Sequence, residues 1–132
     1  MKKRGFLSAP VAELIALMGH TDRLVVCDAG FPVPPGVRRI DLAITRNLPS
    51  LPDVLRVLLD DLAVEHFILA EELREAQAQR YAQIVELLPQ IPHDLIPHAD
   101  FKRAAQDVRA VIRTGDFVPY SNIMLVAGVV FP

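Results

Sequence analysis

The chain has 132 residues, of which 52% are hydrophobic, and 14 basic against 16 acidic side chains give a net charge of −2. This length predicts one domain spanning 1–132, with a core that requires neither disulfides nor metal ions. The near-neutral charge argues against nucleic acid as a partner, and the short apolar runs argue against a membrane-spanning segment.

The single cysteine, Cys27, excludes an intrachain disulfide and is typical of a reducing compartment. The basic first residues superficially resemble a signal peptide, but Pro10 and Glu13 interrupt the apolar region that would follow. A cytoplasmic location is therefore expected. The large hydrophobic fraction indicates strands covered on both faces, apolar contacts between subunits, or both.

Helical periodicity occurs in four segments. In the first, Pro10 suits the opening turn, and Gly19 is expected to end the helix in a left-handed conformation. Apolar residues then recur with i, i+3, i+4 spacing along each segment. The predicted helices span 10–18, 52–63, 77–88 and 98–107.

Apolar runs bounded by turn residues predict six strands. The stretch 29–36 holds three prolines and two glycines and is expected to form a stiff loop after the first strand. The alternation of strands with helices predicts an α/β fold, a single layered domain with a mixed, mostly parallel sheet covered by helices. The predicted strands span 23–28, 37–44, 64–70, 94–97, 110–113 and 123–131.

His20 and Asp28 flank the first predicted strand. Histidine is the side chain best suited to donate a proton near neutral pH. A carboxylate at the carboxyl end of a strand lies where α/β sheets bind ligands, and it can accept two sugar hydroxyls. The alternatives are structural: His20 interacts with the end of the preceding helix, and Asp28 forms an Asx turn.

Two further groups of polar residues could bind a ligand. His98 and Lys102 are one helical turn apart and share a face, which could equally be a solvated cationic surface. Tyr120, Ser121 and Asn122 combine an apolar ring, hydroxyls and an amide, a mixture that suits a sugar. The alternative is a polar turn with Tyr120 half-buried.

Several common motifs are missing. The six glycines form neither GxxxxGK[ST] nor GxGxxG, so no nucleotide-phosphate loop is expected. The four histidines lack the spacing of metal ligands on one helix face. Glu71 and Glu72, which follow the third predicted strand, are explained equally well by a turn, a helix start or a site.

Several separate motifs occur in order along the chain: Gly19-His20-Thr21-Asp22, Val26-Cys27-Asp28-Ala29-Gly30, Arg39-Ile40-Asp41-Leu42, His98-x-x-Phe101-Lys102, Ala110-Val111-Ile112-Arg113-Thr114-Gly115-Asp116 and Pro119-Tyr120-Ser121-Asn122. With these motifs the sequence resembles the D-ribose pyranase family, related to L-fucose mutarotase, over nearly its whole length. The turn Leu48-Pro49-Ser50 is more similar to the ribose branch than to the fucose branch.

This resemblance implies a cofactor-free, metal-free isomerase that interconverts the pyranose and furanose rings of free D-ribose. It makes His20 the proton donor and places Lys102 near the site. Ser121, usually alanine in this family, would contribute mainly its backbone. The sugar-binding residues would be Asp28, His98, Tyr120, Ser121 and Asn122.

The resemblance also implies a homodecamer of two pentameric rings, with sites near subunit boundaries. Two alternatives stay open at this point. The chain could be a non-catalytic sugar-binding or regulatory subunit, or a mutarotase for another sugar such as L-fucose.

Overall fold

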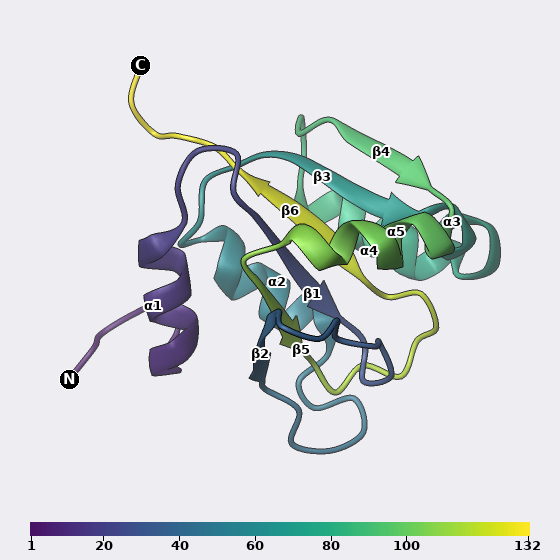
Figure 1. Ribbon diagram of the computed structural model, residues 1–132, viewed down its shortest axis with the longest axis horizontal. Coiled ribbons are helices and arrows are strands. Elements are labelled where there is room, and N and C mark those ends of the chain that lie inside the picture. The colour runs from purple at the N-terminus through teal and green to yellow at the C-terminus, as the bar shows by residue number, and fades with distance from the viewer.

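The computed structural model describes residues 1–132. Six strands form one sheet, and Figure 1 shows helices on both of its faces. The strands span Arg23–Cys27 (β1), Arg38–Asp41 (β2), Val64–Ala70 (β3), His93–Ile96 (β4), Ala110–Arg113 (β5) and Ile123–Ala127 (β6). The helices span Ala9–Leu17 (α1), Leu51–Leu59 (α2), Glu71–Ala76 (α3), Ala78–Leu87 (α4) and His98–Ala104 (α5), with a 3₁₀ turn at Ala105–Asp107. No helix is both long enough and apolar enough to span a bilayer.

The strand order in the sheet is β2-β5-β1-β6-β3-β4. Every neighbouring pair is parallel except the two pairs that contain β6, which is antiparallel to both β1 and β3. Five strands therefore point in one direction, and the mixed, mostly parallel α/β sheet predicted from the sequence is confirmed. The carboxyl ends of these five strands share one edge of the sheet, where β6 begins.

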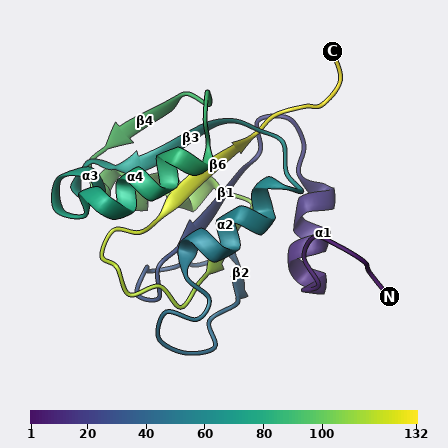
Figure 2. The same ribbon diagram turned by 180° about the vertical axis from the view of Figure 1, so that it is seen from behind.

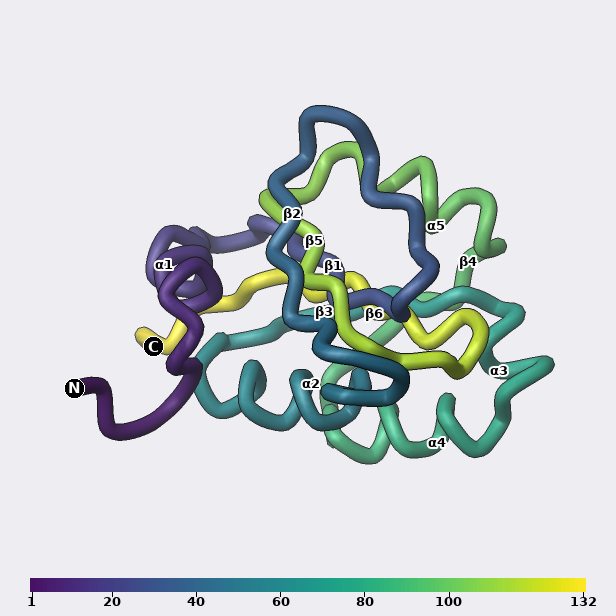
Figure 3. Tube along the Cα trace, turned by 90° about the horizontal axis from the view of Figure 1, so that it is seen from below, coloured from purple at the N-terminus to yellow at the C-terminus, as the bar shows by residue number.

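Alternating side chains of the strands fill two cores. In β1, Leu24 and Val26 face the larger core, which α1, α2 and α4 cover, whereas Val25 and Cys27 face a smaller core with Phe101 of α5. Figure 2 shows the face covered by α2, α3 and α4, and in Figure 3 α5 lies on the opposite side of the sheet from α2 and α4. Burial on both faces explains the apolar character of the central strands.

The first turn of α2 is fixed by its own sequence. The Ser50 hydroxyl accepts a hydrogen bond from the Asp53 amide, and the Asp53 carboxylate accepts one from the Ser50 amide, both at 3.3 Å. Pro52 in the first turn already has the helical φ. This capping box begins the helix at Leu51. The Leu51 amide donates to the Asp116 carboxylate at 2.7 Å.

Four predicted elements differ in extent. The strand predicted at 37–44 ends at Asp41, because its partner β5 ends at Arg113. The helix predicted at 52–63 ends at Leu59, with Asp60 as its C-cap.

The predicted helix 77–88 is α4, but the separate helix α3 precedes it, because Gln77 interrupts the helical backbone with φ −134° and ψ 54°. The last strand ends at Ala127 instead of 131. The Gly128 amide leaves the sheet ladder to bind the Ala63 carbonyl, and the side chains of 129–131 are exposed.

The end of α1 also differs from the prediction. Gly19 does not have the positive φ expected of it; Thr21 does, at 69°. The Gly19 amide instead donates to the Asp22 carboxylate at 2.8 Å. Thr21 then donates its amide to the Ala127 carbonyl, which aligns the chain for β1.

Candidate functional site

Polar residues from distant parts of the sequence meet at the edge where the parallel strands end. Asp28 follows β1, His98 follows β4, Asp116 follows β5, and Asn122 precedes β6. Because β6 runs opposite to its neighbours, its start lies beside the ends of β1 and β3. This is the edge at which α/β sheets bind ligands.

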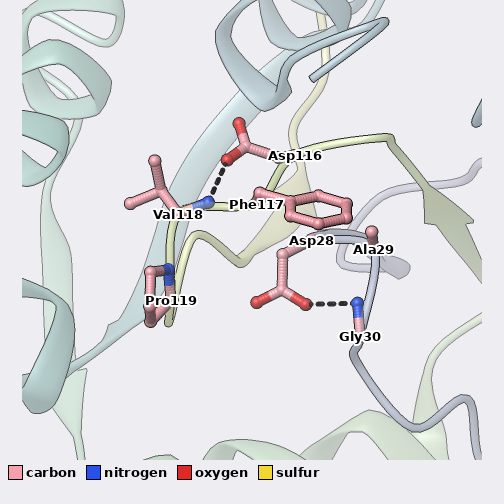
Figure 4. A pocket seen from close by; sticks show the side chains of 7 residues that line it. All are labelled: Asp28, Ala29, Gly30, Asp116, Phe117, Val118 and Pro119. Carbon is pink, nitrogen blue, oxygen red and sulfur yellow. Dashed lines mark hydrogen bonds between the residues drawn. The ribbon is translucent and has the colours of Figure 1, made fainter. Parts of the chain in front are cut away.

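Asp28 is fixed by hydrogen bonds from both sides of the edge. Its backbone amide donates to Oδ1 of Asn122 at 2.8 Å, which joins the end of β1 to the start of β6. Its own Oδ1 accepts from the Gly30 amide at 2.9 Å, so the Asx turn considered for this residue is present. The second carboxylate oxygen points away from Gly30 (Figure 4). Asp28 is thus a turn former and also presents an acceptor to the surroundings.

Asn122 is fully buried and has one amide hydrogen-bonding group left over. Its Oδ1 is used by Asp28, but its Nδ2 has no partner within the chain. Buried amide nitrogens without partners are uncommon, because the lost hydration costs about 1–3 kcal/mol. An unpartnered donor at a ligand-binding edge is therefore a candidate contact for a ligand.

His98 begins α5 and is held by Glu72 of α3. The His98 amide donates to both Glu72 carboxylate oxygens, at 3.0 and 3.1 Å. Its ring packs edge-on against Tyr120, with 5.1 Å between ring centroids and 82° between ring planes. Its Nδ1 is buried without a partner, a second polar atom available to a ligand. Lys102 lies one turn further along α5 and is exposed.

The local environment shifts two pKa values at this edge. Burial raises the pKa of Asp28, opposed by the hydrogen bond from Gly30 and by the nearby Asn122 and His98. Burial also lowers the pKa of His98, and the positive charge of Lys102 lowers it further. Both shifts favour the neutral form of the group, and shifts of this kind are typical of functional sites.

A pocket of about 330 Å³ opens beside Asp28. This volume is at the lower end of the range of about 300–1,000 Å³ for small-molecule sites, so the pocket suits a small ligand. Figure 4 shows Asp28 and Asp116 on opposite sides of Phe117. The lining residues are Asp28, Ala29, Gly30, Asp116, Phe117, Val118 and Pro119.

His20 lies at the other end of the molecule's central strand. It precedes β1, whereas Asp28 follows it, and the five residues of β1 span roughly 16 Å at about 3.3 Å each. The His20 Nε2 contacts Oε2 of Glu65 at 2.8 Å, and the two side chains are 53% and 43% exposed. The structure therefore brings together Asp28, His98, Tyr120, Ser121 and Asn122, with Lys102 nearby, but not His20.

Reasoning from the sequence missed two members of this edge, Asp116 and Arg80. Asp116 comes shortly after β5 as Asp28 comes after β1, so a carboxylate that follows a predicted strand was the signal that could have found it. Arg80 carries no comparable signal, because only the tertiary structure places α4 beside the start of β6. No group of three or more His, Cys, Asp or Glu side chains could hold a metal ion.

Comparison with known proteins supplies independent information. Residues 1–130 match the model of the RbsD / FucU transport protein family. The D-ribose pyranase of Coprothermobacter proteolyticus is 44% identical over 131 residues, covering 99% of this chain and all of that protein. The D-ribose pyranase of Thermotoga maritima is 42% identical over 135 residues, again covering 99% of this chain and all of that protein.

Solved structures agree with the fold. Bacillus subtilis RbsD complexed with D-ribose superimposes with a TM-score of 0.96 at 41% identity, over 99% of this chain and all of that one. The fucose mutarotase of Streptococcus pneumoniae, in complex with L-fucose, superimposes with a TM-score of 0.78 over 99% of this chain and all of that one. Its 19% identity supports the shared fold alone.

Proposed function

Because this chain belongs to the RbsD / FucU transport protein family, we propose that it is a D-ribose pyranase, an isomerase that interconverts the pyranose and furanose rings of free D-ribose. One structural observation supports this assignment most. Two buried polar atoms without partners, Nδ1 of His98 and Nδ2 of Asn122, belong to the residues that surround the Asp28 edge. A small polyhydroxylated ligand would supply the hydrogen bonds that these atoms lack.

The residues at this edge match the surface of a sugar. The Asp28 carboxylate can accept hydrogen bonds from two hydroxyls, while Asn122 Nδ2 can donate to a ring or hydroxyl oxygen. The Tyr120 ring, packed against His98, offers an apolar face to the C–H surface of the sugar. Ser121 would contribute mainly its backbone, and Lys102 would contribute positive charge near His98.

Changing the ring size requires the hemiacetal to open and close again. One group takes the proton of the anomeric hydroxyl while an acid protonates the departing ring oxygen, which gives the open-chain aldehyde. A different hydroxyl then adds to the carbonyl, and the proton transfers run in reverse. A well-placed acid–base group contributes about 10²–10⁴-fold to such a step.

In this proposal the acid is His20 of a neighbouring copy of the chain. Within one chain His20 and the Asp28 pocket lie at opposite edges of the sheet, so a site that contains both needs two copies. His20 is half exposed on the surface and is oriented by Glu65, an arrangement that allows it to reach a neighbour. The exposed apolar side chains Leu17, Val130 and Phe131 offer contact surface. The decamer of two pentameric rings is the assembly we expect.

The same separation supports a second candidate function. A single chain holds the polar pocket without His20 beside it, so it could bind a sugar without changing the ring. A non-catalytic sugar-binding subunit would keep Asp28, His98 and Asn122 and would not need His20. Ring exchange, measured separately from binding, distinguishes the two functions.

NMR saturation transfer between the pyranose and furanose signals of D-ribose tests the proposal. The protein is expected to accelerate exchange, and His20→Ala is expected to abolish the acceleration while ribose still binds. His66→Ala is the matched control, because His66 is also paired with a carboxylate, Asp94, at 3.0 Å. Binding without faster exchange in the wild type would support the binding subunit. Faster exchange of L-fucose anomers, with ribose unchanged, would assign a different sugar.

A further inference from the structure

A buried ion pair between Arg80 and Asp116 lies at the wall of the pocket and takes no part in the proposed ring opening. Arg80 of α4 donates through Nη1 to Oδ2 of Asp116, whose side chain is fully buried, while 15% of the Arg80 side chain is exposed. The Arg80 Nε donates to Gln83 Oε1 at 2.9 Å, which orients the guanidinium. Buried charges persist only when paired and hydrogen-bonded, so this pair fixes whatever is attached to it.

Asp116 is attached to the pocket wall at several points. Its Oδ1 accepts from the Val118 amide at 2.8 Å, as Figure 4 shows, and its Oδ2 accepts from the Leu51 amide at 2.7 Å. Its backbone carbonyl accepts from the Ala29 amide at 2.9 Å. The Asp116 side chain thus connects the start of α2 to the loop before β6, and the Asp116 backbone carbonyl adds the loop after β1.

Arg80 also reaches the far end of that last loop. The same Nη1 that binds Asp116 donates to the Ser121 Oγ at 2.9 Å, and Ser121 is fully buried. Ser121 is adjacent to Asn122, whose Oδ1 accepts a hydrogen bond from the Asp28 amide. The guanidinium therefore joins residue 116 to residue 121 and closes the loop at both ends.

Between these two attachments lies Tyr120 with a φ of 63°. A residue other than glycine keeps such a backbone conformation only where its surroundings fix it. We propose that Arg80 is a positioning residue, which holds Tyr120 and Asn122 in their sugar-binding geometry by linking Asp116 to the Ser121 hydroxyl. The hydroxyl gives Ser121 a role that alanine, the usual residue of the resembling motif, could not have. This inference rests on the proposed function.

Ring-exchange kinetics at a series of ribose concentrations test the proposal. Arg80→Met and Ser121→Ala are expected to raise KM by about tenfold and about threefold, with kcat within about twofold, because the loop binds ground state and transition state alike. Arg80→Lys keeps the charge but lacks the Nε–H that Gln83 orients, so its KM is expected to lie between those of the wild type and Arg80→Met. Arg74→Met, an exposed arginine of α3, is the control and should match the wild type.

The double variant that combines Arg80→Met with Ser121→Ala makes the test specific. If Ser121 acts through Arg80, then Ser121→Ala raises KM in the wild-type background but not in the R80M background. Equal increases in both backgrounds would overturn the proposal, as would an unchanged KM in R80M. The Ser121→Ala substitution removes one hydroxyl, so it tests the link even if R80M is poorly folded.

Hydrogen–deuterium exchange separates this proposal from the proposed function. The amides of 117–122 are expected to exchange faster in R80M and S121A than in the wild type, while amides of the central strands β1 and β6 stay protected. This readout needs no ribose. A wild type that neither binds nor converts ribose would refute the proposed function. Amide hydrogen exchange in 117–122 that is the same in R80M, S121A and the wild type would refute the positioning role.

Discussion

His20 and Asp28 stand at opposite ends of β1, with the whole strand between them. Four of the five residues of the strand, Leu24 to Cys27, are buried, so the element is rigid and cannot bend the two side chains together. The residue proposed as proton donor and the carboxylate proposed to bind the sugar thus lie on different surfaces of one chain. If His20 is the proton donor, catalysis therefore requires contact between two copies of the chain.

Replacing Asp28 by asparagine is expected to stabilise the folded chain at about pH 7. Burial raises the pKa of Asp28, so the folded state disfavours the ionised carboxylate relative to the unfolded state, and this destabilisation is present above the folded pKa. Asparagine keeps an oxygen that can accept from Gly30. Urea unfolding of D28N and wild type measures the difference, which should vanish as the pH falls below the ordinary value of 3.8. A D28N variant less stable than wild type at neutral pH would contradict this.

His98 is expected to make stability fall in mild acid. Burial lowers the pKa of His98, so as the pH falls below its ordinary value of 6.5 the unfolded chain takes up a proton first, and stability is lost down to the folded pKa. In His98→Gln the free energy of unfolding should change less between about pH 7 and pH 5. Urea titrations at intermediate pH values measure this slope. Equal slopes for the two proteins would show that His98 does not contribute.

Gly115 is expected to tolerate no side chain. A Cβ at this position would lie 2.8 Å from the Leu48 carbonyl oxygen and 2.9 Å from its amide nitrogen. Gly115→Ala should therefore lower the free energy of unfolding by about 1–3 kcal/mol, because the backbone at Leu48 must move. Gly19→Ala is the matched control, with its nearest neighbour at 3.5 Å. Thermal or urea unfolding compares them, and similar losses for both would refute the steric explanation.

The sequence predicted most of the fold because its signals were local. Apolar runs of the right length identified β3 and β5 at their observed bounds, and helical spacing after Pro52 identified α2, although not its end. The misses depended on tertiary contacts. The predicted last strand 123–131 continues as an apolar run to Phe131, but no strand pairs with it beyond Ala127. A one-dimensional pattern does not record where the partner strand ends.

The site was predictable in its parts and not in its arrangement. Asp28, His98, Tyr120 and Asn122 were identified from strand ends, a helix start and a polar step, and the structure brings them to one edge. The distance between His20 and Asp28 follows from the strand between them, whereas the gathering of His98, Tyr120 and Asn122 around Asp28 depends on the order of strands in the sheet. Arg80 lies in a helix among glutamines that form no recognised site motif, so only the packing of α4 reveals its partners. The cytoplasmic location stays a prediction from the single cysteine.

Complementation between two inactive variants tests the central claim most directly. H20A lacks the proton donor and D28N lacks the carboxylate of the pocket, and each alone is expected to leave ribose exchange at the uncatalysed rate. Mixed oligomers, formed by unfolding and refolding the two variants together, should recover about one quarter of wild-type exchange. Half of the pockets are intact in an equal mixture, and half of these face an intact His20 across a heterologous interface. NMR saturation transfer measures the recovery, and a mixture as inactive as its parents would contradict a site shared between two copies.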